Sequence, residues 1–314
     1  MINPVQMRDF FIDNLRNAAK KDKNILLISN EQGASALDKF RKELDNQFIN
    51  AGISEQNIIS VSAGLASQGK KVFVYSISSF ITLRCFEQIK IDLNIMKLPV
   101  TILAVGASYS YDTSGPTHHS IDDIAILRTL GNFEIYSPSD NNVLKKVFNE
   151  TLKSKIPNIV RLDRFPLKNI GECKEVDIKR GFRIFGKSKK IAIISTGITT
   201  QIISNLREEL SNEKIEFLNI DIFQIKNFNK KQFKTFLSKV KNIITVEEHT
   251  LNGGIGSLVA EFILDNKLNI SLTRLGIRDE NLYSYLERSK NQEMNNIDKK
   301  SIKEEVKKIL KKKN

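Results

Sequence analysis

The chain has 314 residues, of which 40% are hydrophobic and 27% charged, and its formal net charge is +13. That length suffices for two domains with ordinary cores. No apolar run reaches the ~20 residues of a membrane helix, and the basic residues are too dispersed to indicate nucleic acid as a partner. Two scattered cysteines and the absence of a signal-peptide pattern lead us to expect a cytoplasmic protein.

The first half of the chain alternates between short β-rich runs and helical stretches. We expect strands at 24–29, 71–77, 99–106, 133–138 and 157–162, and helices at 4–21, 55–69, 84–96 and 141–153. This alternation is typical of a parallel sheet covered by helices.

The segment 164–190 interrupts that rhythm because it is polar, contains several glycines and lacks helical periodicity. The alternation then resumes, with strands expected at 191–197, 215–220, 242–249 and 270–277 and helices at 199–211, 230–239 and 254–265. The fold class is therefore α/β, with two consecutive domains that are each a mostly parallel sheet covered by helices. Their expected limits are 1–165 and 188–314, joined by a linker at 166–187.

The lysine-rich end of the chain places four apolar residues on one helical face: Ile302, Val306, Ile309 and Leu310. An amphipathic helix with a solvated basic face explains this pattern better than an arm that binds nucleic acid.

The first candidate motif is "GISEQ", in which Gly52 and Ser54 form a turn before a helix. Ser54 is a plausible N-cap, and Glu55 would lie in the first turn, where the helix dipole favours an anion. Taken alone, Glu55 is interpreted as an ordinary carboxylate at the start of a helix.

The second motif, "SGPTHHSIDD", contains two of the three histidines of the chain, His118 and His119. They lie on a loop after a strand, where α/β folds often hold their chemistry. The neighbouring Asp122 and Asp123 do not complete a zinc spacing. A helix that begins near Ser120 accounts for the aspartates but not for the histidines.

The third motif is "EEHTLNGGIG" at 247–256, a strand end followed by a glycine-rich turn and a helix. This arrangement is similar to a phosphate cradle. It lacks the Lys-Ser/Thr of a P-loop and the G-x-G-x-x-G order of a dinucleotide site, so a tight structural turn is the preferred interpretation.

The motifs occur in an order that resembles the C-terminal half of the transketolase family. The order is "GISEQNIISVSAGLASQGKKVFV", "SSF", "RCFEQIKIDL", "LPVTILAVGASYSYDTSGPTHHSIDD", "IVRLDR" and "VEEHTLNGGIGSLVAEFI". The resemblance covers nearly the whole chain and implies a pyrimidine-binding domain followed by a transketolase C-terminal domain. The same unit occurs in 1-deoxyxylulose-5-phosphate synthase and in the E1-beta component of 2-oxo-acid dehydrogenases.

The resemblance implies a site for thiamine diphosphate. Glu55 matches the glutamate that hydrogen-bonds N1′ of the cofactor's aminopyrimidine, where a carboxylate is needed because it shares a proton with that nitrogen. Phe80 matches an aromatic residue that stacks on the pyrimidine. Tyr75 is a weaker cofactor-binding candidate, for which a place in the sheet core is the preferred interpretation.

The resemblance also implies a substrate side. His118 matches a histidine that faces the substrate in transketolases, which makes it a catalytic and substrate-binding candidate, and His119 stands where the family often has Gln. Arg164 lies near a position that binds substrate phosphate, although Arg161 is an alternative equivalent.

The chain departs from ordinary transketolases at two substrate-reading positions. "Gly106-Ala107-Ser108" replaces the family's H-D-S, and Ser114 replaces an acid before "GPTH". These differences favour a split transketolase-like subunit that transfers a two-carbon ketol unit between sugars, in polysaccharide or unusual-sugar biosynthesis.

The G-D-G…N motif that holds Mg²⁺ and the cofactor diphosphate in the family is absent from this sequence. We therefore expect no metal ligands here, a separate N-terminal subunit that supplies them, a homodimer contact between copies of this chain, and an α2β2 heterotetramer. The alternatives are an E1-beta-like subunit of a 2-oxo-acid dehydrogenase and a non-catalytic subunit that dimerises a thiamine enzyme.

Overall fold

Alternating apolar residues build the first sheet of this computed structural model, which describes residues 5–31, 33, 35–171, 176–188 and 190–311. The runs "ILLIS" and "TILAV" form fully buried strands, β1 (Ile25–Ser29) and β4 (Thr101–Val105). The other strands are β2 (Phe48–Asn50), β3 (Lys71–Ile77), β5 (Glu134–Tyr136) and β6 (Asn158–Leu162). All pairings are parallel, and the strand order is β2-β1-β3-β4-β6-β5.

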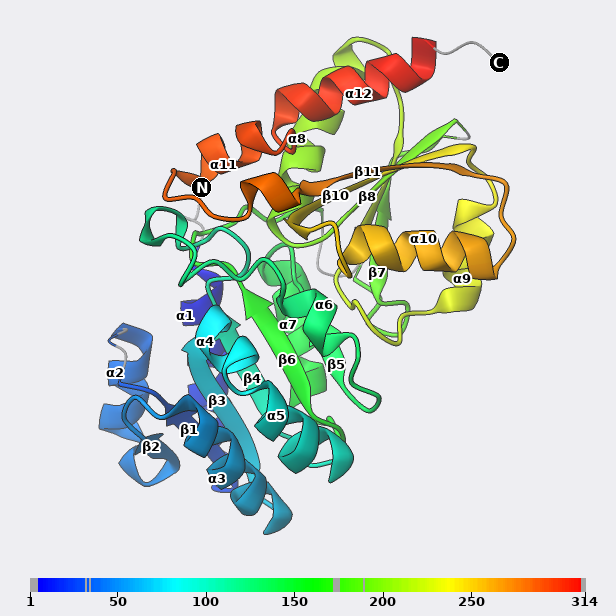
Figure 1. Cartoon of the computed structure of the whole chain (residues 1–314). Helices are drawn as coiled ribbons and strands as arrows, with labels where there is room; N and C mark the ends of the chain where they lie inside the picture. Colours follow the sequence, from blue (N-terminus) through cyan, green and yellow to red (C-terminus); the bar gives the residue numbers. More distant parts are fainter. Residues whose placement is uncertain (1–4, 32, 34, 172–175, 189, 312–314) are drawn as a thin grey trace.

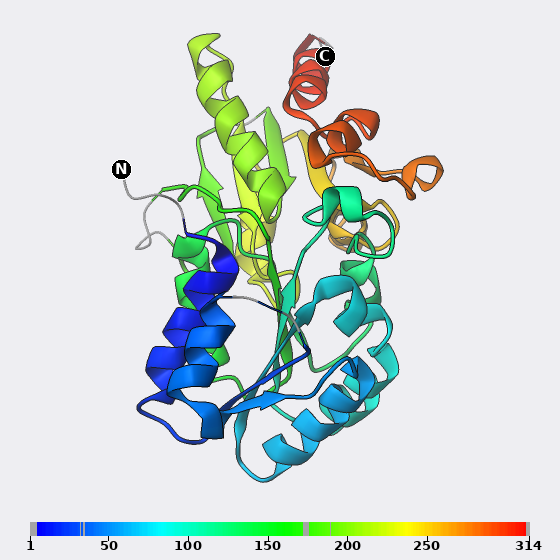
Figure 2. The same cartoon turned by 90° about the vertical axis from the view of Figure 1, so that its left-hand side faces the viewer.

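Helices cover both faces of this sheet (Figures 1 and 2). One face packs against α1 (Met7–Ala19), α2 (Ser35–Glu43) and α7 (Asn141–Thr151). The opposite face packs against α3 (Glu55–Ser67), α4 (Ser78–Leu83), the π-helical segment Ile89–Ile95 that follows the short α5 (Phe86–Gln88), and α6 (Asp123–Leu127). Because successive strand residues face opposite sides, Phe73 packs toward α1 while Val74 packs toward α3.

The second sheet has the order β11-β10-β8-β9-β7. Its strands are β7 (Phe182–Phe185), β8 (Ile191–Ser195), β9 (Leu218–Ile222), β10 (Asn242–Thr250) and β11 (Ser271–Ile277), and only the pairing of β7 with β9 is antiparallel. One face packs against α8 (Ile198–Asn212) and α12 (Lys299–Lys311), the other against α9 (Lys230–Leu237) and α10 (Ile255–Asp265). The α/β class and the two mostly parallel sheets are thus as predicted.

Short helices complete the described chain: the 3₁₀ turns Asp45–Gln47, Asp112–Ser114 and Asp279–Asn281, and α11 (Arg288–Met294). The predicted terminal helix is confirmed as α12, in which Ile302 and Val306 are fully buried in the core shared with α8. Within the described residues, no helix has both the length and the apolar character required to cross a membrane.

The structure differs from the sequence predictions at three elements. The predicted linker contains β7, a strand of four residues whose pairing with β9 is long-range and therefore leaves little local signal. The predicted helix at 84–96 changes hydrogen-bonding pattern and becomes a π-helix at Ile89. The strand predicted at 215–220 lies at Leu218–Ile222, and the short helices α2, α4, α6 and α11 were not predicted.

Backbone hydrogen bonds join the two domains. The amide of Ser137 donates to the carbonyl of Phe223 at 2.8 Å, that of Ile225 to Ile135 at 2.8 Å, and that of Thr250 to Ile121 at 2.7 Å. Buried arginines add ion pairs across the same junction, since Arg183 of β7 binds Asp140 at the start of α7. The carboxyl ends of the first sheet are therefore held against the second domain (Figure 1).

Replacing Gly254 with Ala should destabilise the fold by about 1–3 kcal/mol. A Cβ there would lie 2.0 Å from Oε2 of the buried Glu247. A matched control is Gly64→Ala in α3, where no atom lies within 4 Å of the added methyl, so a gain of up to ~1 kcal/mol is expected. Urea unfolding of the three proteins compares the two sites, and equal effects of the two substitutions would contradict this account.

Candidate functional site

The predicted site residues follow the carboxyl ends of neighbouring strands. Glu55 begins α3 after β2, Phe80 lies on α4 after β3, His118 lies in the loop after β4, and Arg164 follows β6. Because these strands are parallel, their carboxyl ends share one edge of the sheet, which is the edge where α/β folds bind ligands.

Glu55 is only 3% exposed. A turn with φ +66° at Gly52 precedes it, and the carbonyl of Gly52 accepts from the amide of Ser54. The Ser54 hydroxyl donates to the carbonyl of Ala51 at 2.7 Å and makes no side-chain cap, so the prediction of a capping Ser54 side chain is wrong. The turn still places the Glu55 carboxylate at the start of α3, 2.8 Å from Nη1 of Arg84.

Aromatic rings connect Glu55 with the predicted substrate side. The Arg84 guanidinium lies over the Phe80 ring at 4.9 Å, and the Phe80 and His118 ring centroids are 5.0 Å apart. His118 is 5.5 Å from the Tyr111 ring, and Arg164 covers Tyr111 at 4.9 Å. We call Phe80, His118 and Tyr111 the ring cluster; it has an arginine at each end and brings four predicted site residues together.

Two residues of this arrangement were missed by sequence reasoning, Arg84 and Tyr111. Tyr111 explains the glycine of "GAS", because Gly106 has φ +92° and a Cβ there would lie 2.2 Å from the Tyr111 ring. Arg84 was visible only as the first letter of "RCFEQ", four positions after Phe80, a spacing that points two helical side chains to one face.

Tyr75 lies away from the ring cluster. It is 3% exposed and belongs to the core beneath α1 and α7, whereas α3 and Glu55 cover the opposite face of the sheet. Burial raises the pKa of Tyr75 to about 12. This placement supports the preferred interpretation as a core aromatic residue.

Arg161 is also engaged inside the protein. Its Nε and Nη2 donate to the two carboxylate oxygens of Asp123 at 2.7 and 3.0 Å, and both side chains are buried. Because these donors are already used, Arg161 is poorly placed to bind a substrate, and Arg164 remains the better candidate.

His119 is buried at 3% exposure, with Nε2 2.7 Å from the carbonyl oxygen of Asp112 and its ring against Tyr109. Burial lowers its pKa, so the ring stays neutral. Its neighbour His118 is more exposed and belongs to the ring cluster, so the two adjacent histidines occupy different environments.

The glycine-rich motif at 247–256 is a structural turn, as preferred from the sequence. The Glu247 carboxylate accepts from the amides of Ile255 at 2.7 Å and Gly256 at 2.8 Å, so the chain's own carboxylate occupies the N-terminus of α10. Burial raises the pKa of Glu247 to about 7. His249 is fully buried beside Asp123, with Nδ1 2.7 Å from the carbonyl of Thr250.

Acidification should weaken the fold through His249. Burial lowers its pKa to about 4, below the ordinary 6.5, so the unfolded chain binds a proton between these values that the folded chain does not. The contribution of the neutral ring is complete above pH 6.5 and declines by about 2 kcal/mol at pH 5. Urea unfolding of wild type and His249→Gln should show their stability difference narrow by that amount between pH 7 and pH 5. Glu247 acts with the opposite sign in both proteins and cancels; a constant difference would contradict the prediction.

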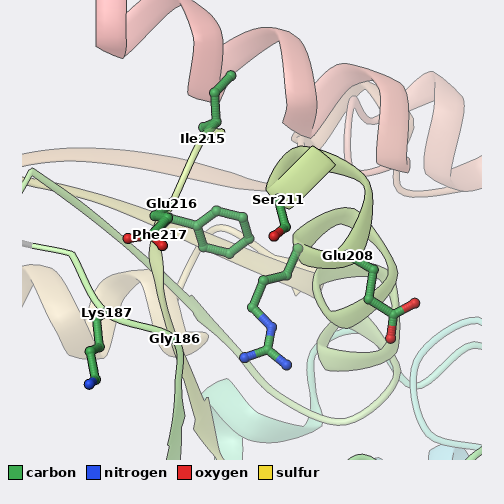
Figure 3. Close-up of a pocket in the computed structure, with 8 residues that line it drawn as sticks. Gly186, Lys187, Glu208, Ser211, Ile215, Glu216 and Phe217 are labelled. Atoms are coloured by element: carbon green, nitrogen blue, oxygen red, sulfur yellow. The ribbon is translucent and has the colours of Figure 1, made fainter. Parts of the chain in front are cut away.

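The described ranges contain no group of three or more His, Cys, Asp or Glu that could hold a metal ion. A cavity of about 250 Å³ lies on the second domain, between the end of β7 and α8 (Figure 3). Its lining includes Lys187, Glu208 and Phe217 but no residue of the ring cluster, so it is separate from the candidate site.

The fold and the site together define a two-domain α/β protein whose strand ends present a buried carboxylate beside an aromatic cluster. The chain belongs to the transketolase family: residues 3–168 match the transketolase pyrimidine binding domain, and residues 182–302 match the transketolase C-terminal domain.

Curated relatives include single subunits of two transketolases. One is the second of the lettered subunits of apulose-4-phosphate transketolase from Phocaeicola vulgatus, which is 32% identical over 287 residues, covering 89% of this chain and 90% of the relative. The other is the SqwH subunit of the 6-deoxy-6-sulfo-D-fructose transketolase of Clostridium sp. (strain MSTE9), which is 27% identical, covering 87% of this chain and 85% of the relative.

Solved structures share the fold. A split gene transketolase described as an inactive beta4 tetramer has a TM-score of 0.87 at 24% identity and covers 99% of this chain and 100% of its own. Transketolase from Pichia stipitis has a TM-score of 0.80 at 16% identity, and the match covers 98% of this chain but 46% of that longer protein.

Proposed function

We propose that this chain is one subunit of a split, thiamine-diphosphate-dependent transketolase that transfers a two-carbon ketol unit between sugars. The observation that carries the proposal is the buried carboxylate of Glu55 at the start of α3, next to the Phe80 ring. The similarity to named transketolase subunits over most of the chain supports it.

The residues fit the pyrimidine part of the cofactor. Glu55 offers a carboxylate that accepts a hydrogen bond in a site with little water, and Phe80 offers an aromatic ring for stacking. When bound, thiamine diphosphate supplies the electron sink for breaking and forming carbon–carbon bonds. In this proposal Glu55 holds a proton at N1′ of the pyrimidine, and the buried setting keeps water from competing for that proton.

The opposite end of the ring cluster fits an anionic sugar. Arg164 is exposed and pairs with no carboxylate among the residues described, and its guanidinium is held over Tyr111. His118 lies between that ring and Phe80, with its Nδ1 3.0 Å from the Thr117 hydroxyl. We propose that His118 contacts the sugar near the reacting carbons and that Arg164 binds a phosphate or sulfonate at the far end of the substrate.

A partner subunit is part of the proposal. Apolar side chains that are 40–61% exposed surround the Glu55 end of α3: Val61, Leu83, Ile91, Ile95 and Met96. Contiguous exposed apolar surface of this kind is typical of a subunit interface. We propose that copies of this chain and a separately encoded N-terminal subunit assemble there as α2β2 in the cytoplasm, and that the N-terminal subunit holds Mg²⁺ and the cofactor diphosphate.

Co-purification with the product of the neighbouring open reading frame tests this function. Calorimetric titration with thiamine diphosphate in the presence of Mg²⁺ should show binding to the mixture and not to either chain alone. Tight Mg²⁺-dependent binding by this chain alone would contradict the split arrangement, and a mixture that binds no cofactor would contradict the function. Apulose 4-phosphate and 6-deoxy-6-sulfo-D-fructose are the first ketose donors to assay.

A further inference from the structure

Arg84 contacts both groups that the proposed function assigns to the cofactor's pyrimidine. It lies at the junction of α4 and α5. Its Nη1 donates to Oε2 of Glu55 at 2.8 Å, and its Cζ lies 4.9 Å from the centroid of the Phe80 ring. One side chain therefore provides a hydrogen bond to the buried carboxylate and a flat partner for the aromatic ring.

A guanidinium is suited to stand in for an aminopyrimidine. Both groups are planar, both present N–H donors at their edges, and both stack on an aromatic face. The guanidinium and the pyrimidine ring cannot make these contacts in the same place at the same time. Resting on the proposed function, we infer that Arg84 is a placeholder that occupies the pyrimidine position in the unliganded chain and leaves it when the cofactor binds.

The local structure allows this exchange. The Arg84 side chain is 49% exposed, whereas that of Glu55 is 4% exposed. The Arg84 backbone is held, because its carbonyl accepts from Nε2 of Gln56 at 3.0 Å and the next residue, Cys85, is fully buried. The guanidinium therefore has a path to solvent while the backbone of the site stays in place.

The energetics give the placeholder a reason. A buried carboxylate without a counter-charge destabilises a fold, and Arg84 supplies that charge to Glu55 until the cofactor arrives. The same contact lowers the fraction of molecules that are ready to bind, so the apparent affinity for the cofactor falls by that fraction. Arg84 thus stabilises the free subunit and weakens cofactor binding.

Two variants of the co-purified complex test the inference. Arg84→Gln removes the charge and the stacked cation, and it should tighten thiamine diphosphate binding about 10-fold in calorimetry with Mg²⁺ present. Arg84→Lys keeps the charge but loses the flat group, and it should give a smaller gain. In this chain alone, Arg84→Gln should lower the melting temperature, and the loss should shrink when Glu55→Gln is also present.

The matched control is Arg41→Gln. Arg41 also pairs with a carboxylate, Asp38, at 2.5 Å and also lies over an aromatic ring, Phe48, at 5.8 Å, but outside the site. It should leave cofactor affinity unchanged. Weaker or unchanged binding by Arg84→Gln would overturn the placeholder, as would an equal loss of melting temperature with and without Glu55. A wild-type complex that binds no cofactor would instead overturn the proposed function, and the placeholder with it.

Discussion

Replacing Glu55 with Gln is expected to lower kcat of the assembled enzyme by about 10²–10⁴-fold. The amide keeps the shape of the side chain and can still accept a hydrogen bond from Arg84, but it cannot share a proton with the cofactor's N1′. Because the fold around α3 is retained, the variant should still assemble with its partner. Steady-state ketol transfer measured with the purified complex gives the loss directly.

The control for that substitution is Glu43→Gln. Glu43 is another carboxylate held by basic side chains, with Arg16 at 2.6 Å and Lys20 at 2.5 Å, but it lies at the end of α2. Removing its charge should leave kcat within about twofold, since exposed ion pairs contribute little. A fully active complex that carries Glu55→Gln would eliminate the proposed role of Glu55, even if cofactor binding persists.

Replacing Arg183 with Met is expected to destabilise the chain by about 3–5 kcal/mol, because it leaves buried carboxylates without a counter-charge. The guanidinium binds Asp221 at 2.9 Å and Asp140 at 3.0 Å, and all three side chains are fully buried. It also donates to the carbonyl of Ile170 at 2.7 Å, so one residue joins both domains and the segment between them. Chemical denaturation measures the loss.

A matched control lies on the same aromatic ring. Arg183 and Arg207 both cover Phe185, at 5.1 and 5.4 Å, but Arg207 pairs with no carboxylate among the described residues. Arg207→Met should therefore change stability by less than about 1 kcal/mol. Adding Asp221→Asn to Arg183→Met should recover part of the loss, because it removes one of the unpaired charges. Equal effects of the two arginine variants would show that stacking on Phe185, and not charge pairing, stabilises the junction.

Local sequence patterns predicted the sheets and most of their helices. Buried strands such as Lys71–Ile77 are continuous runs of β-formers, and helices such as Asn141–Thr151 repeat apolar residues at helical spacing, so the signal is contained in the segment itself. The strand β7 gave no such signal because it is short and is defined by its pairing with β9.

The candidate site divides in the same way. Glu55, Phe80, His118 and Arg164 were named from motif order, and the amino-acid sequence by itself determined the family, the α/β class and these candidates. Only the tertiary structure decided that Arg161 binds Asp123, that Tyr75 faces the core, and that Arg84 and Tyr111 belong to the site. The physical reason is that family and element type are encoded in local patterns of residue chemistry. Whether a charged or aromatic side chain is free to meet a ligand depends instead on partners that lie far away in the chain and reach it only after folding.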